Sequence, residues 1–208
     1  MSTRAEQPKP PFPPQEISPP GQEHEMDPQP RYSAPHYRGS SKLKNQVAII
    51  TGGDSGIGRC VATLFAREGA DVTLVYLPEE ETDAQETRDA VTNEGRRALL
   101  VAGDVRDSNF CRDVVEQTVQ EFGRLDILVN NAAYQKHRSS LDELTEEQWD
   151  RTFKTNIYGY FYMVKAALEH MGSVASILNT GSITGLDGSA NLLDYSATKG
   201  AIHAFTKS

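Results

Sequence analysis

Cysteine is scarce in this chain, and long apolar runs are missing. Only two cysteines occur among the 208 residues, Cys60 and Cys111, and their spacing suits neither a disulfide framework nor a metal site. We predict two reduced thiols in helices and no bound metal. A membrane-spanning helix would need a run of about eighteen apolar residues, and a secretory signal would need a basic and then apolar N-terminus. Neither is found, so the sequence predicts a cytoplasmic protein with no membrane partner.

Basic charge is also in short supply. The chain has 21 Lys and Arg residues against 29 Asp and Glu residues, a formal net charge of -8. Binding to the phosphates of nucleic acid requires a basic face, so we expect no nucleic acid partner. The length allows one well-buried domain with a tail, because two full-sized domains would need a longer chain.

Proline is nearly absent beyond the first fifth of the chain. Residues 1–42 hold ten of the eleven prolines, and proline blocks the backbone hydrogen bonding of helices and sheets. The sequence leaves two interpretations of this Pro-rich tail open. It is either a disordered leader or an extended arm that lies along its own domain or a neighbouring subunit. The candidate anchors of such an arm are Phe12, Tyr32, His36 and Tyr37.

From residue 43 to residue 208 strand-like and helix-like stretches alternate. Strands are predicted at 47–51, 71–77, 98–101, 126–130 and 174–180, with helices between them and a last helix that begins near Tyr195. Continuous apolar strands, each followed by a helix, are typical of a parallel sheet covered on both faces. The predicted fold is therefore α/β, a doubly wound parallel sheet of the Rossmann type.

One long helix is predicted over 146–168. Its apolar stripe consists of Trp149, Phe153, Ile157 and Phe161, which are spaced by four residues. This stripe is either buried against the sheet or part of an interface between subunits, and both interpretations stay open.

A glycine-rich turn, Thr51-Gly52-Gly53-Asp54-Ser55-Gly56-Ile57-Gly58, separates the first strand from the first helix. Backbone N–H groups at such a helix N-terminus can receive a diphosphate, and glycine lets the phosphates approach closely. The spacing is Gly-x-x-x-Gly-x-Gly, unlike the Gly-x-Gly-x-x-Gly of the longer dinucleotide-binding enzymes. The turn predicts a dinucleotide site.

This turn resembles that of the short-chain dehydrogenase/reductase family. Further segments match the family in chain order: Asp104-Val105, Asn130-Asn131-Ala132-Ala133, Asn156, and the set Ser182, Tyr195 and Lys199. The resemblance covers about residues 43 to 208. Tyr37-Arg38-Gly39-Ser40 together with the Pro-rich tail resembles a bacterial general-stress, glucose/ribitol-dehydrogenase-like branch of the family.

The resemblance implies a set of cofactor-binding residues. They are Gly52, Asp54, Ser55, Gly56, Ile57, Gly58, Tyr76, Asp104, Val105, Asn131, Ala132, Ala133, Tyr195 and Lys199. Ala133 departs from the family, which usually has glycine there. We expect one methyl group to be tolerated if the backbone φ of Ala133 is below zero.

The implied catalytic residues are Asn156, Ser182, Tyr195 and Lys199. Tyr195 and Lys199 are four residues apart, so they stand on one helix face. Moving the phenol pKa from ~10 to about 7 takes roughly 4 kcal/mol, which the Lys199 ammonium would supply together with the positively charged nicotinamide of an oxidised cofactor. Tyr195 would then act as general acid or base, and Ser182 would polarise the substrate oxygen. By resemblance, Asn156 would support a water that leads from Lys199 to solvent.

The choice of cofactor is read at the end of the second strand. No Arg or Lys occurs there, and the run Glu79-Glu80-Glu81 follows. These carboxylates would repel the 2′-phosphate of NADP(H), so the sequence favours NAD(H) while leaving NADP(H) open. The same run could equally be a solvated charge cluster at a helix start.

These residues predict an NAD(P)-dependent oxidoreductase, which moves a hydride between a nicotinamide cofactor and the carbonyl or alcohol carbon of a small substrate. The family would continue with a sixth strand and a substrate lid after Ser208, so we expect a domain incomplete on its C-terminal side. A non-catalytic nucleotide-binding stress protein and an inactive fragment of the enzyme are the alternatives. The resemblance also implies a homo-oligomer, and we expect the tail to be protease-sensitive and dispensable for cofactor binding.

Overall fold

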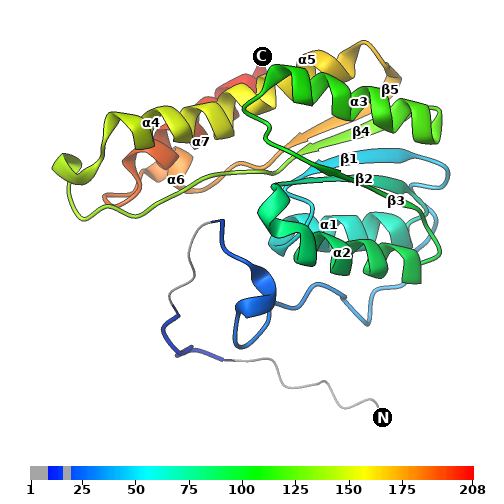
Figure 1. Cartoon of the computed structure of the whole chain (residues 1–208), viewed down its shortest axis with the longest axis horizontal. Coiled ribbons are helices and arrows are strands. Elements are labelled where there is room, and N and C mark those ends of the chain that lie inside the picture. The colour runs from blue at the N-terminus through cyan, green and yellow to red at the C-terminus, as the bar shows by residue number, and fades with distance from the viewer. Residues whose placement is uncertain (1–8, 16–19) are drawn as a thin grey trace.

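The computed structural model describes residues 9–15 and 20–208 (Figure 1). Five parallel strands form one sheet in the order β3-β2-β1-β4-β5. The strands are β1 Val47–Thr51, β2 Asp71–Tyr76, β3 Ala98–Ala102, β4 Leu125–Asn130 and β5 Met171–Asn179. The strand order reverses between β1 and β4, as in a doubly wound fold. The predicted parallel α/β sheet is thereby confirmed.

Helices cover both faces of this sheet. They are α1 Gly56–Arg67, α2 Glu81–Asn93, α3 Ser108–Phe122, α4 Glu146–Phe153, α5 Gly159–Leu168, α6 Thr184–Asp187 and α7 Leu193–Lys207. Figure 1 shows α1 and α2 below the sheet and α3 and α5 above it, with α4, α6 and α7 together at one end. Among the residues that the structure describes, no helix is both long and apolar enough to cross a membrane.

The core explains why the strands are apolar along their whole length. Alternate residues of a strand point to opposite faces of a sheet, and both faces are buried here. Ile49 packs with α3 and α5, whereas its neighbours Ala48 and Ile50 pack with α1 and α2. Cys60 in α1 and Cys111 in α3 are free thiols, as predicted.

The predicted helix over 146–168 contains a π-helical segment, Lys154–Tyr158, between α4 and α5. Its buried face is not the predicted apolar stripe. Trp149 and Phe161 are 38% and 48% exposed. The buried residues are displaced by one position and are polar in α4: Gln148, Thr152, Asn156, Tyr160, Met163 and Ala167. The polar part faces α7, which offers hydrogen-bond partners, so of the two open interpretations the structure disfavours burial of the whole stripe against the sheet.

The edge strand β5 is largely open to solvent. Among the described residues it pairs only with β4, and Val174 is 92% exposed. It begins at Met171, three residues before the predicted start.

The described part of the Pro-rich tail lies along its own domain, as the second interpretation proposed. The Tyr37 hydroxyl donates a hydrogen bond to the Glu68 carboxylate. Arg67 donates to the backbone oxygens of Ser33 and Ala34 at 2.8 and 2.9 Å. The candidate anchor Phe12 is 52% exposed instead. Residues 1–8 and 16–19 of the tail lie outside the described residues.

Candidate functional site

A cleft of about 530 Å³ opens at the carboxyl ends of the strands. Parallel sheets bind ligands at this edge, where the strand order reverses. Half of the residues that line it are predicted cofactor residues: Gly52, Asp54, Ser55, Gly56, Ile57, Tyr76, Asp104, Val105, Asn131, Ala132 and Ala133. The remaining predicted residues, Gly58, Tyr195 and Lys199, are not part of the lining.

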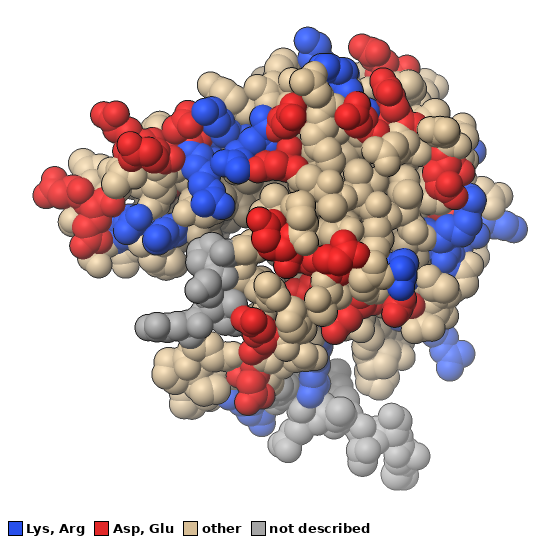
Figure 2. Space-filling view, in the orientation of Figure 1, with Lys and Arg blue, Asp and Glu red and all other residues tan. Residues whose placement is uncertain are grey.

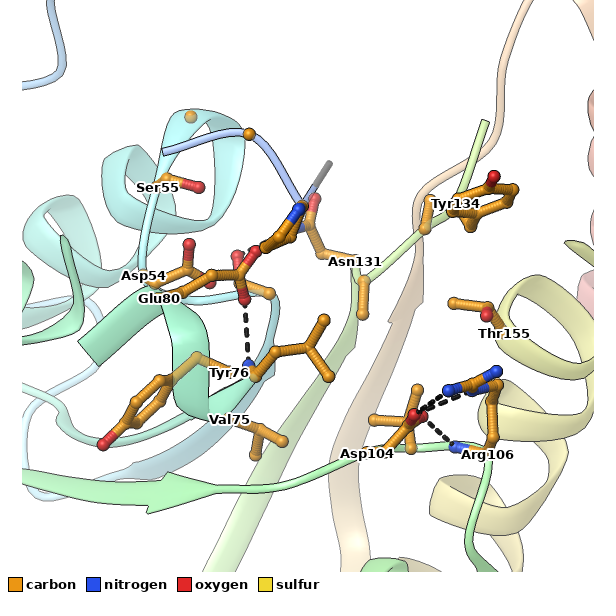
Figure 3. A pocket seen from close by; sticks show the side chains of 18 of the residues that line it. Asp54, Ser55, Val75, Tyr76, Glu80, Asp104, Arg106, Asn131, Tyr134 and Thr155 are labelled. Atoms are coloured by element: carbon orange, nitrogen blue, oxygen red, sulfur yellow. Dashed lines mark hydrogen bonds and ion pairs between the residues drawn. The ribbon is translucent and has the colours of Figure 1, made fainter. Parts of the chain in front are cut away.

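The glycine-rich turn is tied to the end of β4 by Thr51 and Asn131. Thr51 Oγ1 accepts hydrogen bonds from the backbone N–H groups of Asn131 and Ala132 at 2.9 and 3.0 Å. The Asn131 amide donates to the carbonyl oxygens of Thr51 and Gly52, both at 3.1 Å. These bonds fix two walls of the cleft relative to each other (Figure 3). A preformed turn of this kind suits a diphosphate, because its N–H groups are already oriented.

Gly58 supports the turn from behind. A Cβ at Gly58 would lie 1.8 Å from the carbonyl oxygen of Gly52, so only glycine lets α1 start so close to the turn. Ala133, where the family usually has glycine, is not strained. Positive φ in non-glycine residues of the described chain is confined to Ala34, Ser41 and Asn45, which meets the condition set for tolerating the extra methyl group.

Carboxylates gather where the second strand ends. Asp54 is buried, and burial raises its pKa. Burial and the neighbouring Asp54 charge raise the pKa of Glu80 to about 7. Tyr76 lines this wall with its ring, while its hydroxyl turns away from the cleft (Figure 3) and donates to Glu81 at 2.6 Å. This end of the cleft therefore disfavours additional negative charge.

The opposite wall contains two arginines that sequence reasoning missed, Arg106 and Arg151. Arg106 pairs with Asp104, to which its Nε and backbone N–H donate at 2.7 and 2.9 Å (Figure 3). Arg151 lies over the Tyr134 ring, 4.2 Å from its centre. Because they belong to a loop and to α4, far apart in sequence from the glycine-rich turn, no local signal marked them.

The predicted catalytic pair stands on α7. Lys199 is fully buried, and its ammonium lies 5.3 Å from the centre of the Tyr195 ring. It also lies 5.7 Å from the centre of the Tyr160 ring. Its Nζ donates a hydrogen bond of 2.6 Å to the Thr180 carbonyl oxygen. The ammonium is thus held between two aromatic rings by a strand-end carbonyl.

The acidity of these groups differs from the expectation. Burial raises the pKa of Tyr195 above its ordinary value, although a hydrogen bond from Ser182 acts to lower it. Burial also lowers the pKa of Lys199 to about 8. The cation lies over the face of the Tyr195 ring in this structure, and a phenol pKa lowered jointly by Lys199 and an oxidised nicotinamide stays a prediction.

Ser182 follows β5, next to both Tyr195 and Thr184. Its hydroxyl lies 2.9 Å from the Thr184 hydroxyl and accepts the Thr184 backbone N–H at 3.2 Å. Ser182 also acts on the acidity of Tyr195, whose pKa it lowers. Two hydroxyls, of Ser182 and Tyr195, can therefore face one substrate oxygen.

Asn156 is a buried clamp within the π-helical segment. Its Oδ1 accepts the Tyr134 backbone N–H at 2.7 Å, and its Nδ2 donates to the Tyr134 carbonyl and the Thr198 hydroxyl at 3.0 Å. The side-chain amide is therefore occupied by protein groups, and the support of a water that leads from Lys199 to solvent stays a prediction. π-Helical turns often occur at functional sites.

A second buried clamp, not anticipated from the sequence, positions the start of α7. Asp194 Oδ2 accepts hydrogen bonds from Thr152 and Gln148 of α4 at 2.6 and 3.2 Å. Its Oδ1 accepts the Tyr195 backbone N–H at 2.9 Å. The polar face of α4 thus holds the residue that precedes Tyr195, the predicted catalytic tyrosine.

One hydrogen-bonded path joins the catalytic pair to the cleft. Thr180, whose carbonyl holds Lys199, donates through its hydroxyl to Asn131 Oδ1 at 3.3 Å. Asn131 in turn holds the glycine-rich turn. The fold and this site define a protein of the Rossmann type, with a dinucleotide cleft beside a Ser, Tyr and Lys set.

The chain belongs to the short chain dehydrogenase family, which matches residues 46–208. It is 52% identical over 90% of its length to General stress protein 39 of Bacillus subtilis, and spans 65% of that relative. It is 47% identical over 94% of its length to the Glucose and ribitol dehydrogenase of Daucus carota, and spans 69% of that relative. The chain therefore resembles the branch that its sequence predicted.

A solved structure of a short chain dehydrogenase from Burkholderia cenocepacia, in complex with NADP, has the same fold. It superposes with a TM-score of 0.76 at 34% identity and covers 80% of this chain and 67% of that one.

Proposed function

We propose that this protein is an NAD(P)-dependent oxidoreductase that transfers a hydride between the nicotinamide and the carbonyl or alcohol carbon of a small aldehyde, ketone or sugar alcohol. The observation that carries the proposal is the Ser182, Tyr195 and Lys199 set, linked by hydrogen bonds to the dinucleotide cleft through Thr180 and Asn131. The cofactor, when bound, supplies or accepts the hydride.

The chain's own residues would handle the proton. Ser182 orients the substrate oxygen, and Tyr195 donates a proton to that oxygen in reduction or removes it in oxidation. The buried Lys199 cation favours the phenolate form of Tyr195 when the proton leaves. The cleft residues fit a dinucleotide, because Gly52 and Gly56 of the lining add no side-chain bulk where the cofactor would approach the turn.

Within this function we propose a preference for NAD(H). Asp54 and Glu80 line the cleft near the end of β2, where a 2′-phosphate would be read. The two arginines that line the cleft, Arg106 and Arg151, lie on the opposite wall. Arg106 already pairs with Asp104. The Burkholderia cenocepacia relative holds NADP, so comparing the Michaelis constants for NADH and NADPH decides the point. A strong preference for NADPH would overturn it.

The exposed aromatic side chains of α4 and α5 support the proposed homo-oligomer. Trp149, Tyr158 and Phe161 are each more than a third exposed. Figure 2 shows acidic and basic residues interspersed on the visible face of the molecule.

We also propose a cytoplasmic location.

The function is tested with the purified 208-residue protein. Fluorescence titration measures NADH and NADPH binding, and a panel of aldehydes, ketones and sugar alcohols measures turnover. Tyr195→Phe should retain cofactor binding and lose turnover by at least about 100-fold, since general acid catalysis contributes that much. Tyr158→Phe, a change at an exposed tyrosine of the preceding helix, should leave both unchanged. Binding without turnover of any compound would favour a nucleotide-binding protein without catalysis.

A further inference from the structure

The tail places a buried carboxylate at the edge of the dinucleotide cleft. Glu23 is only 6% exposed. Its Oε2 accepts a hydrogen bond of 2.6 Å from the backbone N–H of Gly56, the first residue of α1 and part of the cleft lining. Its Oε1 pairs with Arg59 Nη1 at 2.9 Å. A side chain of the tail thus occupies a position built from an N–H group and a guanidinium.

The tail is held in this place by α2. The fully buried Asp83 accepts the backbone N–H groups of Glu23 and His24 at 2.6 and 3.1 Å. The His24 ring Nδ1 lies 2.9 Å from the same carboxylate. Pro20 and Gly21, just before this anchor, line the cleft themselves. Figure 3 shows the blue ribbon of the tail passing above Ser55 toward Asn131.

The location of Glu23 relates it to one part of a dinucleotide. Gly56 starts the helix after β1, and Asp83 belongs to the helix after β2. A carboxylate held by both lies on the β1 and β2 side of the cleft. In Rossmann-type sites this side reads the adenosine ribose, where NAD(H) has a 2′-hydroxyl and NADP(H) has a 2′-phosphate.

Arg59, the cation paired with Glu23 among the described residues, already has several acidic partners. Arg59 pairs with Glu23, Asp83 and Glu86. Its guanidinium also donates to the carbonyl oxygens of Asp54 and Asp83 and to the Thr87 hydroxyl. Arg59 already pairs with three acidic residues, one of which is Glu23. A phosphate bound at Arg59 would therefore lie close to the Glu23 carboxylate. Like charges at such close range in a buried site repel strongly.

We propose that Glu23 is a specificity-determining residue, whose carboxylate occupies the anion-binding position formed by Gly56 and Arg59 and so excludes NADP(H) in favour of NAD(H). The inference rests on the proposed function, in which the cleft holds a nicotinamide dinucleotide. This proposal gives the Pro-rich tail a role in the choice of cofactor, in addition to the role of the residues at the end of β2.

The test compares Glu23→Gln with Glu86→Gln. Glutamine at residue 23 keeps an oxygen for the Gly56 N–H and removes the charge. Glu86 pairs with the same Arg59 Nη1 at 3.0 Å and is 47% exposed in its side chain, whereas only Glu23 also accepts the Gly56 N–H. It is therefore a matched control for loss of one negative charge beside Arg59. Thermal unfolding establishes that each variant is folded.

In Glu23→Gln the dissociation constant for NADPH should fall about tenfold relative to that for NADH, whereas Glu86→Gln should change this ratio by less than about twofold. The wild-type protein should bind 5′-AMP more tightly than 2′,5′-ADP, a readout that does not depend on the variants folding. An unchanged NADPH to NADH ratio in Glu23→Gln, an equal change in Glu86→Gln, or tighter wild-type binding of 2′,5′-ADP would overturn the inference. Failure of the wild type and both variants to bind either dinucleotide would instead overturn the proposed function.

Discussion

Lys199 and Tyr195 meet through a ring face, with the ammonium 5.3 Å from the ring centre and one helical turn along α7. The ammonium proton is directed to the Thr180 carbonyl oxygen. A cation that is fully buried and held by one carbonyl has lost most of its hydration. The charge of Lys199 therefore lowers the stability of the folded protein.

The burial of Lys199 predicts a pH-dependent stability. Its pKa falls from 10.5 to about 8 in the folded protein. Between these values the unfolded chain binds more protons than the folded chain, so stability rises with pH in this window. The free energy of unfolding of the wild type, relative to Lys199→Met, should rise by about 3 kcal/mol from pH 7.5 to 10.5. Urea unfolding at each pH measures it, with Lys165→Met at an exposed position as control. A flat difference would contradict the burial of the charge.

The close approach of Gly58 to Gly52 predicts that even alanine is not accepted there. A Cβ would lie 1.8 Å from the Gly52 carbonyl oxygen, so the turn or α1 must shift. Gly58→Ala should lower the free energy of unfolding by about 3 kcal/mol and weaken dinucleotide binding. Gly172→Ala, where a Cβ meets nothing within 4 Å, should stay within about 0.5 kcal/mol. Equal stability of the two variants in chemical denaturation would refute this geometry.

The hydrogen bond from Tyr37 to Glu68 predicts how the tail is released. This bond, with the backbone N–H groups of Lys42 and Ser40, lowers the pKa of Glu68 to about 2. Tyr37→Phe should raise that pKa and speed both amide exchange at Ser40 and Lys42 and trypsin cleavage after Arg38.

Because the lowered pKa stabilises the folded state above the ordinary value of 4.5, the advantage of the wild type over Tyr37→Phe should be complete near pH 6 and vanish as the pH falls toward 2. Tyr158→Phe, at an exposed tyrosine of another helix, serves as the control. Identical exchange in Tyr37→Phe and the wild type would show that the tail is held elsewhere, at Glu23 and Asp83.

Predictions from the local sequence pattern were confirmed where the structure depends on neighbouring residues of the chain. The apolar runs of β1 and β4 and the spacing of Gly52, Gly56 and Gly58 predicted the sheet and the turn, because strand burial and turn geometry depend on adjacent residues. The long helix was less predictable. Its hydrophobic stripe suggested one buried face, yet the structure buries Gln148 and Thr152, because Asp194 of a distant helix supplies partners for their polar groups.

The sequence by itself determined the order of strands and helices and the glycine-rich turn, since each follows from residues within a few positions along the chain, whereas Ser182, Tyr195 and Lys199 were proposed from the resemblance to a family. Tertiary structure alone decided the burial of Lys199, the clamps made by Asn156 and Asp194, and the docking of Glu23 at α1. These depend on segments that are distant in sequence, and desolvation and charge pairing arise only when the folded chain brings such segments into contact.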